Sequence, residues 1–195
     1  LIKAIDSSVA ENMPGVVAVL TRDDLSDIDP YYGHAIQDRP IVALEKVRFV
    51  GEPVAAVAAE TAAQAEAAMV HIQVDYEELP VAASLEAALA ADAPLLHDGE
   101  LRPGAAHGLG DLPDRAGNVC YSYSIDRGDL NLASEVADIV IDREYTFPAI
   151  YQYSMETHSV IAQHDGEEIR LWASCQHPFL VRAEMAKLFD LPIDR

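Results

Sequence analysis

The chain has 195 residues, with 33 acidic and 13 basic side chains and a formal net charge of −20. A surface this acidic repels phosphate backbones and anionic lipids, which argues against nucleic-acid binding and against membrane attachment. Half of the residues are hydrophobic, so the chain can bury a core of its own.

The first forty residues predict short strands and helices in alternation. Asp6 can cap a short helix over Ser7–Met13, which Pro14-Gly15 ends. The apolar run Val16–Thr21 predicts a strand, and Asp23-Asp24 starts a second short helix or turn. Residues 27–40 show no hydrophobic period, which predicts an irregular excursion.

A reversal is expected in the middle of the first half. Val47–Val50 and Val54–Glu60 read as strands, and Gly51-Glu52-Pro53 interrupts pairing between them, so we expect a hairpin-like turn. The longest apolar run, Pro53–Ala59, is far shorter than the ~18–20 residues that span a bilayer.

The strongest helix signal follows this turn. Thr61 and Gln64 have the spacing of a capping box, and Ala62–Ile72 is rich in good helix formers. Gln73–Leu79 alternates as a strand does, and Ser84 can cap a further helix that runs to Ala91. Strand, helix and strand in this order predict an α+β domain over residues 1–97.

Residues 98–117 are the predicted linker between two domains. Five glycines and two prolines stand here without a hydrophobic period, and so long a structureless loop is uncommon inside a compact domain. The second domain, residues 118–195, is expected to be incomplete at its C-terminal end.

The second domain is predicted to contain two helices, a strand and a hairpin. The helices cover Leu130–Ala137 and Pro178–Phe189, and Asp138–Pro148 reads as a strand. Ser154–His164 and Glu168–Ser174 are expected to form the hairpin, with Asp165-Gly166 as its turn.

Polar side chains concentrate in this second domain, whereas the common phosphate, nucleotide and zinc motifs are absent. A zinc site is one interpretation, but two of the histidines flank a turn, so convergence on one centre is not expected. A Cys175–His177 nucleophile pair is disfavoured because alternate strand residues do not hydrogen-bond through their side chains. Cys120 is expected to be a small buried apolar residue. The cluster comprises Gln152, Glu156, His158, His164, Cys175, Gln176 and His177.

Six longer motifs follow one another along the chain: Met13–Thr21, Lys46–Thr61, Val74–Pro80, Gly117–Val119, Tyr153–His158 and Leu171–Arg182. In this order, the first three resemble the α/β hammerhead domain of the aldehyde oxidase/xanthine dehydrogenase family, and the last three resemble the start of that family's molybdopterin-binding region. The resemblance covers nearly the whole chain.

The resemblance implies a fragment of the large subunit of a molybdenum hydroxylase, one that oxidises aldehydes or N-heterocycles with water as the oxygen source. It implies molybdopterin or molybdopterin cytosine dinucleotide in the full-length subunit, and no cofactor or molybdenum bound to this fragment alone. The implied partners are the rest of the large subunit, an iron–sulfur small subunit and a flavin subunit. A bacterial, cytoplasmic protein is expected, with the periplasm as the alternative location.

The family's catalytic Glu and its Gly-rich cofactor loops correspond to sequence beyond Arg195, so the resemblance assigns no catalytic residue to this chain. Several members carry a Gln near the molybdenum centre, six residues before the Glu of the Met-Glu motif. That position is Ile150 here, and Gln152 lies two residues later on the same predicted strand face, so Gln152 is the candidate cofactor contact. Glu156 is expected to be a supporting carboxylate rather than the base.

One alternative belongs to another class. The chain could be a stand-alone acidic protein-interaction module that uses the hammerhead fold without a cofactor. Under the first interpretation, a fragment of a larger subunit, we expect self-association of the fragment, because an incomplete second domain leaves apolar surface uncovered.

Overall fold

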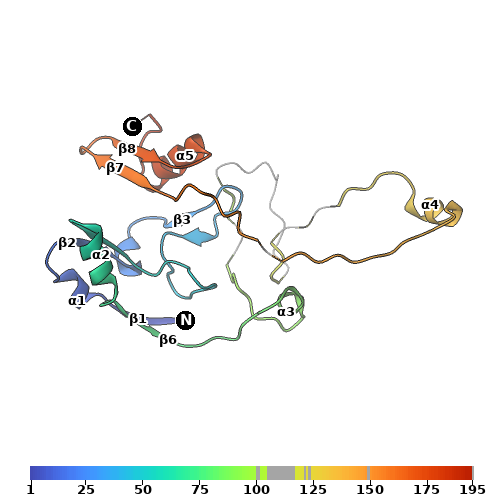
Figure 1. Ribbon diagram of the computed structural model, residues 1–195, viewed down its shortest axis with the longest axis horizontal. Helices are drawn as coiled ribbons and strands as arrows, with labels where there is room; N and C mark the ends of the chain where they lie inside the picture. Colours follow the sequence, from blue (N-terminus) through green and yellow to red (C-terminus); the bar gives the residue numbers. More distant parts are fainter. Residues whose placement is uncertain (100–101, 105–116, 121, 123, 149, 195) are drawn as a thin grey trace.

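The computed structural model of the chain describes residues 1–99, 102–104, 117–120, 122, 124–148 and 150–194. Within these residues, short helices accompany antiparallel two-stranded sheets, and the predicted α+β class is confirmed (Figure 1). No helix in this part of the chain is long and apolar enough to cross a membrane.

Two sheets form the centre of the N-terminal part. β1 (Ile2–Asp6) pairs with β6 (Gln73–Tyr76), and β2 (Val16–Leu20) pairs with β5 (Ala56–Ala59), both antiparallel. The strands predicted over Val16–Thr21, Val54–Glu60 and Gln73–Leu79 are therefore confirmed, with shorter bounds. Each sheet joins one strand from the first twenty residues to one that follows it by about forty or seventy residues.

The short helices begin where side chains satisfy free backbone amides. Thr21 and Asp24 form a capping box on η1 (Arg22–Leu25), and Thr61 accepts from the Gln64 amide at the start of α2 (Ala62–Met69). The Ser84 hydroxyl accepts from the Ala87 amide at the start of α3 (Leu85–Leu89). These caps follow the sequence pattern because each cap spans only three residues.

The Asp6 cap differs slightly from the prediction. Asp6 precedes the N-cap of α1 (Ser8–Glu11), and its carboxylate accepts from the backbone amide and the hydroxyl of Ser8. Helix α1 is also shorter than the predicted Ser7–Met13, and the chain turns at Gly15, whose φ is +83°.

The core is small and lies in the first seventy residues. At the edge of this core, the Arg22 guanidinium links two segments by donating to the carbonyl oxygens of Ile2 at 3.1 Å and Leu44 at 2.7 Å. The buried apolar residues among those described are Ile2, Ala10, Leu25, Val42, Ala43 and Ala68.

The predicted hairpin between Val47–Val50 and Val54–Glu60 is wrong, although its turn is present. Residues 47–50 form no strand, and β5 pairs with β2 instead. The Glu52 carboxylate accepts hydrogen bonds from the backbone amide and the guanidinium of Arg48. That backbone amide is therefore not available for pairing with a neighbouring strand. The Glu52 amide donates to the Phe49 carbonyl at 3.2 Å, and Gly51 has φ +95°, so the chain does reverse here.

The irregular excursion carries a small hairpin. β3 (Tyr31–Tyr32) pairs with β4 (Arg39–Pro40). Residues 102–104, which fall in the predicted linker, lie beside residues 33–37 of this hairpin: the Gln37 amide donates to the Arg102 carbonyl at 2.9 Å and the Gly104 amide donates to that of Ala35 at 2.8 Å. Most of the predicted linker lies outside the described residues.

The last part of the chain forms a strand–strand–helix unit. β7 (Val160–His164) and β8 (Ile169–Ala173) make the predicted antiparallel hairpin, with Gly166 at φ +96° in its turn, although β7 begins at Val160 rather than at Ser154. Helix α5 (Pro178–Leu188) follows β8, as predicted, and lies near the β3 region (Figure 1).

Two expectations for the second domain are wrong. Helix α4 (Leu130–Val136) forms with its Asp129 cap, but Asp138–Pro148 forms no strand, because no described strand lies beside it. Helix α4 stands apart from the other labelled elements (Figure 1). Cys120 is exposed rather than buried, since no described element covers its segment.

Candidate functional site

Gln152 lies in an irregular segment ahead of β7. The segment from Ile150 to His158 forms no strand, so the predicted shared strand face of Ile150 and Gln152 is not present. Tyr153 has φ +51°, which takes the backbone out of the extended region. Its ring packs edge to face against the Tyr151 ring, with 5.8 Å between the ring centres. Gln152 therefore stands between two tyrosines that contact each other, and its side chain is exposed.

The hairpin separates the histidines of the polar cluster. Ser174 ties its open end: the Ser174 amide donates to the Ser159 carbonyl at 3.0 Å, and the Ser174 hydroxyl accepts from the Ser159 amide at 2.8 Å. This places His158 and Cys175 at one end of the hairpin, whereas His164 lies at the turn end. Five residues of strand span roughly 16 Å, so His164 cannot join the other two at one centre.

No group of three His, Cys, Asp or Glu side chains within the described part of the chain converges in a way that could hold a metal ion. His177 is the N-cap residue of α5 but makes no capping hydrogen bond through its side chain, and Cys175 is exposed. The structure thus offers neither a metal centre nor an oriented nucleophile among these residues.

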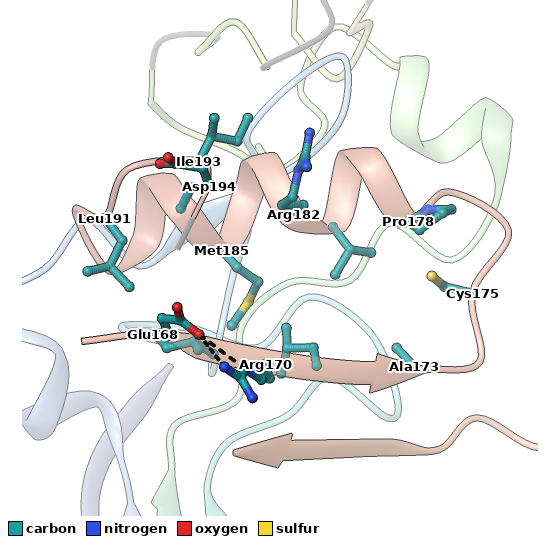
Figure 2. A pocket seen from close by; sticks show the side chains of 14 residues that line it. Glu168, Arg170, Ala173, Cys175, Pro178, Arg182, Met185, Leu191, Ile193 and Asp194 are labelled. Atoms are coloured by element: carbon teal, nitrogen blue, oxygen red, sulfur yellow. Dashed lines mark hydrogen bonds and ion pairs between the residues drawn. The ribbon is translucent and has the colours of Figure 1, made fainter. Parts of the chain in front are cut away.

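A cavity of about 420 Å³ lies between β8 and α5. Met185 extends from α5 toward β8, and Cys175 lies on the connection between the two elements (Figure 2). Glu168 and Arg170 line the β8 side and form an ion pair with each other at 2.7 Å. These two charges therefore satisfy each other, and the charged side chains of Arg182 and Asp194 also line the cavity.

The turn of this hairpin is stabilised electrostatically. The backbone amides of Glu168 and Glu167 donate to the Asp165 carboxylate and hold the pKa of that carboxyl below its ordinary value. The Glu168 carboxylate accepts hydrogen bonds from Arg170 and raises the pKa of its guanidinium. The hydrogen bonds behind both shifts lie at the β7–β8 turn, away from Gln152 in the chain.

Sequence reasoning missed two polar groupings that organise the fold. The Asn118 side chain accepts from the Leu96 amide and donates to the carbonyl oxygens of Ala88 and Pro94, which ties the α3 region to the chain beyond the predicted linker. The second grouping joins Lys187 of α5 to Gln37 and Asp29. No short-range pattern marks either, because the partners are separated by 22 to 158 residues.

Two family models match the chain in succession. Residues 1–80 match the aldehyde oxidase and xanthine dehydrogenase a/b hammerhead domain, and residues 112–195 match the molybdopterin cofactor-binding domain.

Similar proteins are found both among curated sequences and among solved structures. A probable xanthine dehydrogenase subunit of Bacillus subtilis (strain 168) is 34% identical, over 95% of this chain and 23% of that protein. Quinoline 2-oxidoreductase from Pseudomonas putida 86 has a TM-score of 0.76 and 30% identity, over 99% of this chain and 24% of that one. CO dehydrogenase from Oligotropha carboxidovorans has a TM-score of 0.81 and 29% identity, over the same shares.

The fold and the successive matches define a hammerhead domain joined to molybdopterin-binding sequence. The chain belongs to the aldehyde oxidase and xanthine dehydrogenase family, as its sequence motifs indicated. It spans about a quarter of the length of the relatives it matches, and it aligns with the large subunits of molybdenum-dependent hydroxylases. The alternative of a stand-alone acidic module is not favoured, because the similarity continues well past the hammerhead domain.

Proposed function

We propose that this chain is part of the large subunit of a molybdenum hydroxylase that oxidises aldehydes or N-heterocycles with water as the oxygen source. The single observation that carries this proposal is the succession of a hammerhead match over residues 1–80 and a molybdopterin cofactor-binding match over residues 112–195. In the proposed division, residues 1–97 form the hammerhead domain, 98–117 the linker and 118–195 the first portion of the cofactor-binding domain.

The described residues fit the cofactor only in part. The Gln152 carboxamide can donate and accept hydrogen bonds, and it makes none with the described residues, so it is chemically able to contact a pterin or an oxygen ligand. The Gln152 side chain is also exposed. Gln152 is therefore proposed as one peripheral cofactor contact, and no catalytic residue is assigned to this chain.

When bound, the molybdenum carried by molybdopterin would be the redox centre that accepts the electrons of substrate oxidation. This chain's own contribution is to hold the Tyr151–Tyr153 segment in place and, through the hammerhead domain, to support the rest of the subunit. The proposed partners are the remainder of the large subunit, an iron–sulfur subunit and a flavin subunit, and the proposed dinucleotide form is molybdopterin cytosine dinucleotide. We place the protein in the cytoplasm, where the free Cys120 and Cys175 would remain reduced.

The test is oxygen-isotope incorporation by a large subunit that contains this chain, expressed in a host that makes the cofactor. We expect stoichiometric molybdenum and label from ¹⁸O-water in the product of at least one member of an aldehyde and N-heterocycle panel. The 195-residue chain alone is the control and is expected to hold no molybdenum. A subunit without molybdenum and without label in any product would contradict the proposal.

The role of Gln152 is tested separately. In that subunit, Gln152→Ala should lower molybdenum occupancy or shift the cofactor's electronic spectrum, whereas Gln163→Ala, on exposed strand β7, should leave both unchanged. Identical occupancy and spectra in all three proteins would remove Gln152 from the cofactor contacts without affecting the assignment of the family.

A further inference from the structure

The Lys187 side chain joins helix α5 to the segment around the β3–β4 hairpin. The Lys187 ammonium donates to the Gln37 side-chain oxygen at 2.7 Å and lies 3.6 Å from the Asp29 carboxylate. Gln37 is only 7% exposed, so this hydrogen bond satisfies a polar group that water reaches poorly. The contact joins residues that are 150 positions apart.

A second cation approaches the same carboxylate from another segment. Arg102 forms an ion pair with Asp29, and its guanidinium lies 4.8 Å from the centre of the Tyr31 ring. The Arg102 carbonyl also accepts from the Gln37 amide at 2.9 Å. Asp29 and Gln37 are thus each contacted by both remote segments.

The hairpin has little structure of its own to maintain it. β3 and β4 have two residues each, and isolated two-stranded hairpins are marginal in water even when longer. Its turn is tightly packed: a Cβ added to Gly33 would lie 1.9 Å from the Ile36 carbonyl oxygen. Its order must therefore come largely from the neighbours that contact it.

We propose that Asp29, Gln37, Arg102 and Lys187 form a polar latch, which couples the order of the β3–β4 hairpin to the docking of the β7–β8–α5 unit. The latch is a conformational device that lies outside the proposed cofactor contact. Through Lys187, it sets where α5 and the hairpin that precedes it lie relative to the hammerhead part of the chain.

The two arms of the latch differ in strength. The ion pairs of Asp29 with Arg102 and Lys187 join side chains that are about 40% exposed, and such pairs are screened and individually weak. The Lys187–Gln37 hydrogen bond has a buried acceptor, which is left unpaired when the cation is removed. Added salt should therefore weaken the ion pairs of Asp29 and leave the Lys187–Gln37 hydrogen bond largely intact.

The test is hydrogen exchange in the 195-residue chain, measured at the amides of Gln37 and Gly104, which bond within the hairpin region. Lys187→Met should make both amides exchange about tenfold faster. This variant removes the charged donor of the Lys187–Gln37 hydrogen bond, and the hairpin then opens more often. Arg182→Met is the matched control: Arg182 is also on α5, but its guanidinium lies 5.5 Å from the ring of Phe179 on the same helix. It should leave the hairpin amides unchanged.

A rescue and a double mutant guard against simple loosening of α5. Lys187→Arg keeps a cationic donor and should restore slow exchange. Gln37→Leu combined with Lys187→Met should accelerate exchange by less than the two single changes together, expressed as opening free energies. The reason is that the double variant removes both partners of the buried contact and leaves neither one unpaired. Unchanged exchange in Lys187→Met, equal acceleration in Arg182→Met, or strict additivity in the double mutant would each overturn the latch.

Discussion

Gly51 occupies a backbone conformation that other residues adopt at a cost. Its φ is +95°, and an added Cβ would meet no atom within 4 Å. Gly51→Val should therefore destabilise the chain through backbone strain rather than through a clash, by about 1–3 kcal/mol. Urea unfolding measures this loss.

Two variants serve as controls for Gly51. Gly51→Asn should cost less, because Asn tolerates left-handed conformations better than a β-branched residue. Gly99→Val places the same side chain in open space at a position without a left-handed φ, and should be nearly neutral. A Gly51→Val protein with an unchanged unfolding midpoint would mean that the turn at Phe49–Glu52 tolerates other backbone conformations.

Asp29 should make stability depend on acid. Partial burial acts to raise the pKa of its carboxyl, but hydrogen bonds from Arg102 and the Tyr31 amide, with the charges of Arg102 and Lys187, outweigh it and hold the pKa below the ordinary 3.8. Because the folded-state pKa is lowered, the ionised carboxylate contributes stability above pH 3.8, and this contribution is lost as the pH falls through the folded-state pKa.

Asp29→Asn should accordingly be less stable than the parent at about pH 6, with the difference vanishing near pH 2. Urea midpoints at the two pH values provide the measurement. In an Arg102→Met background the difference at the higher pH should shrink, since that background lacks the strongest interaction lowering the Asp29 pKa. A difference that persists unchanged in strong acid would show that Asp29 acts through packing instead of charge.

At the scale of elements, the cap of α2 is the clearest local determinant. The Gln64 amide donates to the Thr61 hydroxyl at 3.3 Å, and α2 buries Ala68 completely. Thr61→Ala should destabilise the chain by about 1 kcal/mol, because one amide of the first turn loses its acceptor. Thr61→Ser retains the hydroxyl and should lie within a few tenths of a kcal/mol of the parent in thermal unfolding. Equal losses in both variants would assign the effect to the Thr61 methyl group.

The elements that the sequence predicted correctly are those determined within a few residues. The caps at Thr61 and Ser84 and the Asp165-Gly166 turn all formed as expected, because each depends on neighbours in the chain. Helix α5 likewise begins at Pro178, whose missing amide needs no partner there.

Strand pairing was predicted less well, because β propensity does not identify a partner. Val47–Val50 has the composition of a strand, but its neighbour β5 pairs with β2, which lies about forty residues earlier. Asp138–Pro148 has alternating apolar residues but no strand beside it among the described residues. For the candidate site, Gln152 as a cofactor contact stays a prediction, and the hairpin separates the histidines of the polar cluster. The Lys187–Gln37 contact had no sequence signal.

The whole molecule exposes much more surface than a folded monomer of its mass. Its accessible surface is 15588 Å² for 21.2 kDa. The size scaling of folded monomers gives about 9,000 Å² for that mass. The excess means that much of this surface has no covering neighbour within the chain.

The uncovered apolar side chains concentrate in the second half of the chain. Ile139, Ile141, Tyr145 and Phe147 are each more than three-quarters exposed, and they lie in the extended segment that was predicted as a strand. The Phe179 ring on α5 is 74% exposed. Contiguous exposed apolar surface of this kind promotes association, and the unpaired edges of short sheets add to it.

We therefore expect the 195-residue chain to self-associate, with exchange of the second domain across residues 98–117 as the proposed route. The net charge of −20 opposes association through repulsion, which salt screens, so association should strengthen as salt is raised. Sedimentation velocity over a concentration series at low and high salt, with binding of an apolar dye, measures both effects. Phe147→Asp should weaken association, whereas Val50→Asp, which adds the same charge at a fully exposed position of the first domain, should change it only slightly. A monomer up to millimolar concentration at high salt, without dye binding, would mean that residues 118–195 close on themselves in solution and that the exposed apolar segment finds its cover within the same chain.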